Sequence, residues 1–390
     1  MNLRSKLFLD YYFGGFLHAV LRIPTILLGK LLRRDHDLSG CREIAILKLL
    51  GGGSLVIAYP ALLALRRLPC LEKLTLITTP AIAPFGALLG VFDEIVIVRD
   101  DQGLLTLAVD SVQAFRKFFR HDALIDLEIH SRLTTVFALL TAARNRIGFF
   151  TGISFWRRYL NTHLLFCNIT NGIYDFYDQL AVLFGASPVD AGECEREFRS
   201  RLGEYGFAGD LLRLAIAPAC SGLSRERMLR HEEWVDVVAH RIAQCEPAVA
   251  ELHLLGAPAD RAEIEQMATL LDERFQGRAV VRNHAGKTSL QESVRIIAAM
   301  DEVLCIDSAL LHFSRLLGRR TVSFWGPTDP RTLLRPSSSG LDEIHYVKIP
   351  CSPCVHMSHQ PPCRGQNICM RLAADPAAPV PRNQPWVLKG

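Results

Sequence analysis

The sequence has no apolar run that can cross a membrane without interruption. The longest candidate, Tyr11 to Gly29, contains Arg22, Pro24 and three glycines, whereas a spanning helix needs about 20 apolar residues. No small-residue cleavage site follows the charged start of the chain, so a secretory signal peptide is not expected.

Neither sign of charge is in large excess. The net charge is +4, and no basic run interleaved with aromatic residues occurs in the body of the chain, so nucleic acid is not expected as a partner. With 49% hydrophobic and 22% charged residues, the chain has the composition of a globular protein. Its 390 residues are enough for two domains.

The eleven cysteines do not suggest a disulfide framework. Seven of them are scattered and sit mostly in apolar surroundings, as reduced core thiols do. Because disulfides are rare in the cytosol, this usage indicates a cytosolic chain. The seven are Cys41, Cys70, Cys167, Cys194, Cys220, Cys245 and Cys305.

Residues 1–40 differ from the rest of the chain. They carry six Lys or Arg against three Asp, with aromatic and aliphatic clusters between the charges. We interpret them as an amphipathic basic-aromatic arm that lies on an anionic membrane surface. The alternative is an arm packed on the protein's own surface.

From Glu43 onward, short apolar runs alternate with helical patterns, which indicates an α/β fold of parallel, doubly wound sheets. The alternation weakens between Thr151 and Gly209 and then restarts. We therefore predict two Rossmann-like domains, residues 41–205 and 210–340, with parallel sheets facing across a cleft. Residues 341–390 are rich in Cys and Pro and are expected to wrap back towards the first domain.

The segment from Glu302 to Pro330 is the most informative. An apolar strand, Val303–Ile306, is followed by Asp307 and by Ser308, a natural helix N-cap, and His312 comes one turn later. Ligands of open α/β sheets bind at such strand ends, where helix N-termini favour anions. The segment therefore predicts a phosphate site, or alternatively a capped helix with a buried His.

Two loops offer further polar or flexible groups. Gly51, Gly52 and Gly53 follow the first strand, but they fit neither a dinucleotide fingerprint nor a P-loop, so a tight structural turn is the alternative. The strand that ends at Ala217 leads into a loop suited to phosphate recognition or, equally, to plain solvation. Its polar residues are Ser221, Ser224, Arg225 and Arg227.

The predicted strand Ala123–Glu128 ends in three titratable groups spaced by two residues, Asp126, Glu128 and His130. Along an extended strand they would project from one face, where one of them could act as a general base. The alternative is a strand rim ion-paired with Arg132.

Four cysteines cluster near the end of the chain. Cys351, Cys354, Cys363 and Cys369 lie within nineteen residues, with His356 and His359 between them. The ligand count is that of a structural zinc site, although the second spacing is irregular.

Taken together, the motifs resemble glycosyltransferase family nine, the lipopolysaccharide heptosyltransferases, from about Arg42 to Met370. The order and spacing of the motifs are more specific than any one of them. They are Ile44–Leu49 with Tyr59–Arg66, Phe92–Val96, Ala143–Gly148, Ala285–Leu290, Ile306–His312, Gly326–Pro330 and Cys351–Cys354.

The resemblance implies a GT-B fold whose carboxyl-terminal half binds a nucleotide-sugar donor. Asp307, Ser308 and His312 would contact the donor diphosphate, and the loop Ser221–Arg227 would add a cation or hydroxyl. Ala309 stands where the family usually has Gly. The nucleoside would lie beside Gly286–Leu290, which includes Lys287, Thr288 and Ser289.

One departure concerns catalysis. The resemblance places Ser54 where the family has its catalytic Asp, beside the glycines of an acceptor-side loop. A Ser hydroxyl of ordinary acidity cannot take the acceptor proton. We therefore predict Glu128 as a relocated base, with Asp126 and His130 as second choices.

The expected function is inverting sugar transfer from a nucleotide sugar, first of all ADP-heptose, to a lipopolysaccharide-type or lipid-linked saccharide. The expected place is the cytoplasmic face of the bacterial inner membrane, with the protein peripheral. No cofactor is required for this chemistry, and zinc would be structural. The competing reading is a catalytically impaired nucleotide-sugar-binding or assembly protein. A third is a GT-B-fold epimerase, for which the arm has no purpose.

Overall fold

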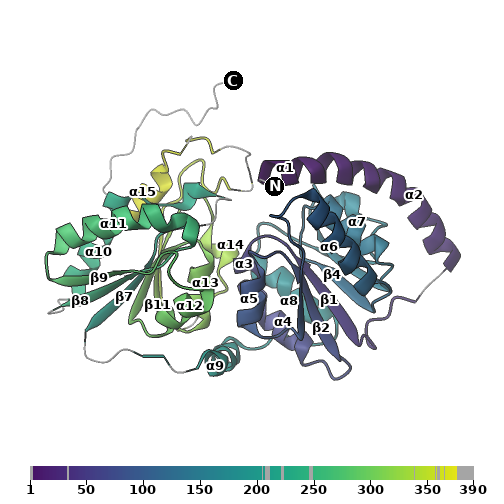
Figure 1. Ribbon diagram of the computed structural model, residues 1–390, viewed down its shortest axis with the longest axis horizontal. Coiled ribbons are helices and arrows are strands. Elements are labelled where there is room, and N and C mark those ends of the chain that lie inside the picture. Colours follow the sequence, from purple (N-terminus) through teal and green to yellow (C-terminus); the bar gives the residue numbers. More distant parts are fainter. Residues whose placement is uncertain are drawn as a thin grey trace. The chain divides into compact units, whose positions relative to one another are not determined.

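A computed structural model describes residues 3–32, 35–203, 205–206, 211–220, 224–245, 249–337, 339–355, 357, 361–363 and 365–375, with side chains from Ser5 onward. The chain divides into two compact units, Met1–Cys194 and Glu195–Gly390 (Figure 1). The division falls inside helix α9 (Ala191–Leu202), ahead of the predicted boundary at residues 205–210.

The first unit contains one parallel sheet with the strand order β3-β2-β1-β4-β5-β6. Its strands are β1 (Glu43–Lys48), β2 (Lys73–Thr78), β3 (Glu94–Ile97), β4 (Ala123–Asp126), β5 (Asn145–Phe150) and β6 (His163–Phe166). Its helices are α1 (Leu3–Leu9), the π-helix η1 (Asp10–Gly14), α2 (Gly15–Leu32), α3 (Gly52–Ile57), α4 (Tyr59–Arg66), α5 (Ala83–Leu89), α6 (Leu104–Lys117), α7 (Arg132–Leu140), η2 (Phe155–Arg157) and α8 (Ile173–Leu183).

The second unit repeats this plan in the order β12-β11-β10-β7-β8-β9. Its strands are β7 (Leu212–Ala217), β8 (Ala250–Leu254), β9 (Ala279–Asn283), β10 (Glu302–Ile306), β11 (Arg320–Trp325) and β12 (Asp342–Tyr346). Its helices are η3 (Arg225–Arg227), α10 (His231–Cys245), η4 (Pro258–Asp260), α11 (Arg261–Phe275), α12 (Leu290–Ala298), α13 (Ala309–Leu316), α14 (Pro330–Leu333) and α15 (Ile368–Ala374).

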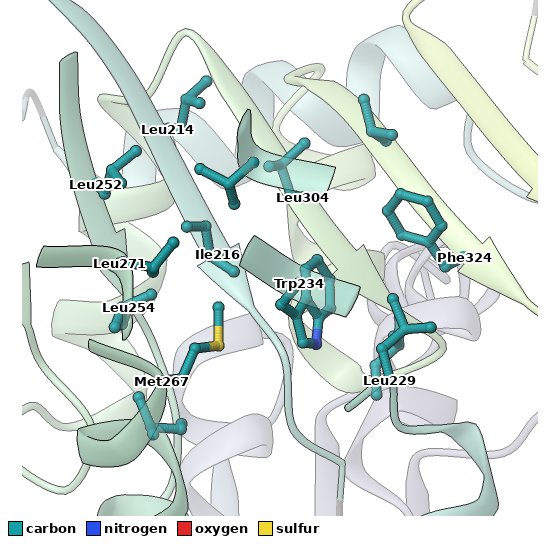
Figure 2. Packing of buried hydrophobic residues seen from close by; sticks show 14 of the residues in the cluster. Leu214, Ile216, Leu229, Trp234, Leu252, Leu254, Met267, Leu271, Leu304 and Phe324 are labelled. Carbon is teal, nitrogen blue, oxygen red and sulfur yellow. The ribbon is translucent and has the colours of Figure 1, made fainter. Parts of the chain in front are cut away.

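Alternate residues of the second sheet build the core beneath its helices. Leu214 and Ile216 of β7 and Leu304 of β10 point to the same face, because side chains of a strand alternate between faces. Trp234 of α10 packs among them with its ring 5.6 Å from that of Phe324 (Figure 2).

In both sheets the chain moves outward from a central strand in one direction and then in the other. The strand order therefore reverses between β1 and β4 in the first unit and between β7 and β10 in the second. Ligands of doubly wound sheets bind at the carboxyl ends of such strands. The prediction of two Rossmann-like units with parallel sheets is confirmed.

Elements in the irregular stretch and near the end of the chain escaped the sequence analysis. They include β6 and α8 between Thr151 and Gly209, and β12 after Leu341. The carboxyl-terminal segment was expected to return to the first domain, and this is wrong for its described part. Helix α15 buries Cys369, Met370 and Ala373 in the core of the second unit.

The arm is helical, and Arg22 and Pro24 do not interrupt it. Residues Ser5–Leu32 form one helical run of mean hydropathy 1.4, which by length and composition alone is sufficient to cross a membrane. The expectation of a broken apolar segment is therefore wrong.

Candidate active site

In the first unit, charged groups meet at the carboxyl ends of β1 and β4. Lys48 is the last residue of β1, and its Nζ lies 3.3 Å from Oε1 of Glu128, which follows β4. The same oxygen accepts hydrogen bonds from the backbone N–H groups of Leu49 (2.7 Å) and Leu50 (2.9 Å). Burial alone would lower the pKa of Lys48, but Glu128 and Tyr177 outweigh it and raise that pKa.

Glu128 therefore has one oxygen fixed and one available. Within the described part of the chain, all hydrogen bonds to its side chain go to Oε1, which leaves Oε2 to accept a proton. The ammonium group of Lys48 and the two N–H groups hold the Glu128 carboxylate in place through Oε1. Oε2 is therefore the oxygen that would act if Glu128 is the general base.

The expectation that Asp126, Glu128 and His130 share one face of a strand is wrong. β4 ends at Asp126, whose Oδ1 accepts the backbone N–H of Glu128 at 3.0 Å and so turns the chain. Asp126 is fully buried and pairs with Arg157, which is also fully buried, at 3.0 Å. Asp126 is therefore a structural residue with no access to a substrate.

The buried side chain of Arg157 holds the loop after β4 in place by hydrogen bonds. It lies in η2 and donates to the backbone carbonyls of Glu128, Phe149 and Ser131 as well as to Asp126. His130 occupies an exposed turn in that loop. The predicted ion pair of Arg132 at the rim is replaced by contacts with the arm, since its guanidinium donates to the Tyr11 carbonyl at 2.7 Å.

The glycine loop matches the structural-turn alternative at two positions. Gly51 has φ +73°, a conformation that favours glycine, and a Cβ on Gly52 would lie 2.5 Å from the Phe85 ring. Ser54 lies in α3 beside Tyr177, whose pKa is raised by burial and partly restored by a hydrogen bond with Ser54. The hydroxyl of Ser54 thus bonds the phenol of Tyr177 and, among the residues that the structure describes, is not seen to contact a general base.

In the second unit, the loop after β7 and the end of β10 meet through Arg227. Its Nη1 lies 2.9 Å from the carbonyl oxygen of Asp307 and 3.1 Å from Oδ2 of the same residue. Both side chains are largely buried. The Asp307 carboxylate therefore positions the guanidinium of Arg227, which is the group with the right charge for a phosphate.

Ser308 is the N-cap residue of α13, as predicted, but its hydroxyl does not cap the helix. Its Oγ is buried and has no hydrogen-bond partner among the described residues. A buried hydroxyl of this kind can donate to a ligand oxygen at the helix N-terminus. Ala309 begins α13 at the same place.

His312 is buried one turn into α13. Burial lowers its pKa to about 4, with Asp307 acting in the opposite direction. His312 is therefore neutral at pH 7 and does not supply positive charge to a phosphate.

The remaining predicted donor residues divide into three groups. Thr288 bonds Ser293 (2.9 Å), and Ser289 caps α12 in a capping box with Glu292, so both side chains have local structural roles. Lys287 is exposed and forms no ion pair within the described residues, whereas Arg225 pairs with Glu263. Ser221 lies outside the described residues.

The four clustered cysteines come near one another around the turn after β11. Burial, reinforced by the neighbouring thiols, raises the pKa of Cys354 to about 11 and that of Cys369 to about 12. No three metal-binding side chains among the residues described are placed to hold an ion together, and His356 and His359 lie outside that set. Zinc at Cys351, Cys354, Cys363 and Cys369 stays a prediction, which metal analysis of chelator-free protein would test.

Sequence reasoning missed Lys48, Tyr177 and Arg157. Lys48 carried a signal, because a lysine that ends an apolar strand must find a counter-ion when that strand is buried. Tyr177 and Arg157 lie in the stretch where the sequence pattern weakens, and only the folded chain brings them to β1 and β4.

Part of the chain resembles a known family. Residues 184–363 match glycosyltransferase family 9 (heptosyltransferase). Lipooligosaccharide heptosyltransferase 2 of Haemophilus influenzae is 35% identical over 78 residues, which are 20% of this chain and 22% of that protein. The chain thus spans about a fifth of the length of this curated relative.

Two solved structures share the fold. ADP-heptose lipopolysaccharide heptosyltransferase II of Escherichia coli aligns with a TM-score of 0.59 and 16% identity, over 78% of this chain and 91% of that one. A family 9 glycosyltransferase of Veillonella parvula aligns with a TM-score of 0.60 and 15% identity, over 80% and 87%. The GT-B fold and the resemblance to glycosyltransferase family 9 are therefore confirmed.

Proposed function

We propose that this chain is an inverting glycosyltransferase of the heptosyltransferase type. Its donor is a nucleotide sugar, with ADP-heptose as the first choice, and its acceptor is a lipopolysaccharide-type or lipid-linked saccharide. It acts at the inner face of the bacterial cytoplasmic membrane. The match of residues 184–363 to family 9 supports the reaction class, and the name of the Haemophilus relative supports the choice of sugar.

The observation that carries the proposal is the group of donors at the carboxyl ends of β7 and β10. Arg227, held by Asp307, and the unpartnered Ser308 hydroxyl lie at the N-terminus of α13. Together they supply a guanidinium, a hydroxyl and a helix dipole, which suit a diphosphate. Lys287 is a further exposed cation in the turn that follows β9.

The chemistry assigned to these groups is a single displacement. The acceptor hydroxyl oxygen forms a bond to the anomeric carbon while the bond from that carbon to the donor phosphate breaks. The hydroxyl proton passes to Oε2 of Glu128, and the nucleoside diphosphate leaves with its added charge stabilised by Arg227 and Ser308. No metal ion takes part in this scheme.

The test compares Glu128→Gln with His130→Gln in a transfer assay. The assay contains ADP-heptose and a cell extract that supplies a truncated acceptor saccharide. Removal of a general base is expected to lower kcat by about 10²–10⁴-fold with donor affinity unchanged. His130→Gln should stay near the parent rate. Full activity of Glu128→Gln excludes Glu128 as the base.

The second candidate is a nucleotide-sugar-binding protein without turnover. Ser54 favours it, because Ser54 holds the buried Tyr177 phenol at the position where the resemblance implies a base. Tight donor binding with neither transfer nor donor hydrolysis, in the presence of acceptor extract, would establish this candidate instead.

A further inference from the structure

The arm is held against the first unit by one stripe of its helical run. Its partly or fully covered residues recur every three or four positions, as one face of a helix requires. They include Lys6, Leu9, Asp10, Gly14, Leu17, His18, Leu21 and Thr25. At the centre, a Cβ on Gly14 would lie 2.9 Å from Cβ of Arg132, so the arm and α7 approach closely there.

Polar groups of this stripe have partners on the unit. The Asp10 carboxylate accepts the backbone N–H groups of Arg132 (3.0 Å) and Leu133 (2.9 Å), which open α7. The side chain of His18 lies 2.7 Å from the carbonyl oxygen of Trp156. Lys6 forms an ion pair with Asp100. Figure 1 shows the arm running along the unit beside α7.

The opposite face of the arm is apolar and exposed along its whole length. Aromatic residues gather at the beginning, and aliphatic ones continue to the end of α2. The exposed residues are Leu7, Phe8, Tyr11, Tyr12, Phe13, Phe16, Val20, Ile23, Leu27, Leu28, Leu31 and Leu32. Monomeric soluble proteins rarely expose a continuous apolar face of this extent, so something is expected to cover it.

A loop that is far from the arm in the sequence extends this apolar face. Ile153 is 86% exposed and Phe155 and Tyr159 are also exposed, in the segment around η2. The guanidinium of Arg22, from the arm, lies 5.3 Å from the centre of the Tyr159 ring. Arg158 lies over both Phe155 and Tyr159. The loop and the arm therefore form one surface with basic groups at its edge.

We propose that the exposed face of the arm and residues 153–159 together form a bilayer-binding surface that lies in the interface of a membrane containing anionic phospholipid. Arg22, Lys30 and Arg158 supply positive charge, and Asp10 is the sole carboxylate between Ser5 and Leu32. The aromatic cluster suits the headgroup level, and the aliphatic residues suit the acyl boundary. A protein partner would have to match an apolar face that carries no acidic group.

The contacts of the stripe exclude a spanning orientation for the docked arm. A spanning helix would carry Lys6, Asp10 and Arg22 into hydrocarbon, where charged side chains are strongly unfavourable. Each of these groups has a partner on the unit, and Asp10 would also leave two backbone N–H groups of α7 without an acceptor. An arm in the plane of the interface keeps all these contacts.

The surface deepens the proposed function by giving a transferase with a lipid-linked acceptor a membrane to act on. Its test needs no turnover, so the two proposals fail separately. The full chain is mixed with phosphatidylcholine vesicles, with or without phosphatidylglycerol, and the bound fraction is measured by flotation. We expect binding that requires the anionic lipid and falls as salt is added.

Matched substitutions identify the surface. Ile23→Glu in the arm and Ile153→Glu in the loop should each weaken vesicle binding by about tenfold or more, because each places a charge in the interface. Arg158→Gln should weaken it by about fivefold. Val182→Glu is the control, since Val182 is as exposed as Ile23 but lies on α8. Circular dichroism checks that all four proteins are folded.

Three outcomes would overturn the proposal. Equal vesicle binding by Ile23→Glu and Val182→Glu would place the membrane contact elsewhere. An Ile23→Glu variant that converts a dimer to a monomer, with no vesicle binding by the parent protein, would assign the surface to a second copy of the chain. Resistance of the bound parent protein to alkaline carbonate extraction would show that the arm spans the bilayer.

Discussion

The ammonium group of Lys48 lies 3.3 Å from Oε1 of Glu128, and both side chains are largely buried. The pair joins the carboxyl ends of β1 and β4 at the place where the strand order reverses. Two features that the sequence separates by eighty residues thus become one charged site. Its energetics give the first prediction.

Replacement of Lys48 by Met should lower the free energy of unfolding by about 3 kcal/mol, because it leaves the Glu128 carboxylate buried without its counter-ion. Urea unfolding at pH 7 measures the change. The double variant Lys48→Met, Glu128→Gln should recover most of the loss, since neither charge is then unpaired. A Lys48→Met protein as stable as the parent would show that the two N–H groups alone hold Glu128.

The position of the base can be tested by moving it back. In a Glu128→Gln protein with impaired transfer, Ser54→Asp should restore part of the rate, about tenfold over Glu128→Gln alone. The reason is that Ser54 occupies the position where the resemblance implies a catalytic Asp. Ser54→Asn is the control, because an Asn side chain has the size of an Asp side chain without its charge. Equal rates for Asp and Asn at position 54 would contradict the prediction.

Stability should fall in mildly acidic solution through His312. Because burial lowers its pKa from 6.5 to about 4, the unfolded chain takes up this proton before the folded chain does. The contribution of His312 to stability is therefore complete above pH 6.5 and is lost as the pH falls from 6.5 to 4. The loss amounts to about 3 kcal/mol over that interval, at about 1.36 kcal/mol per pH unit.

Urea unfolding of the parent and of His312→Gln across this interval measures that contribution. The difference in free energy between the two proteins should shrink as the pH falls, because Gln does not titrate. A constant difference would show that His312 is accessible to protons in the folded chain.

The docking of the arm should depend on Asp10. Asp10→Ala is expected to cost about 1–2 kcal/mol, the usual effect of removing a helix N-cap, since it removes the acceptor for two N–H groups of α7. Hydrogen exchange at the amides of Arg132 and Leu133 should become faster. Asp10→Asn retains one carbonyl oxygen and should show a smaller effect. Unchanged exchange in Asp10→Ala would mean that Ser131 caps α7 sufficiently by itself.

The local pattern of the sequence was enough to predict most strands. The predicted strand that ends at Ala217 and the predicted strand Val303–Ile306 are found as β7 and β10, because apolar runs between turn residues leave few alternatives for a buried parallel strand. β6 and β12 were missed, since half-covered edge strands carry little periodicity. The end of β4 was misplaced by two residues, because the side chain of Asp126 turns the backbone.

The sequence by itself determined the two parallel sheets, the placement of Asp307, Ser308 and His312 between β10 and the first turn of α13, and the basic-aromatic character of the arm, because each follows from residues close together in the chain. The tertiary structure decided which groups meet. It buried Asp126 against Arg157, attached Asp307 to Arg227, paired Glu128 with Lys48 and docked Asp10 on α7. Which charged side chains pair depends on which strand ends and helix starts are neighbours in the fold. The periodicity of apolar residues along the chain does not specify these neighbours.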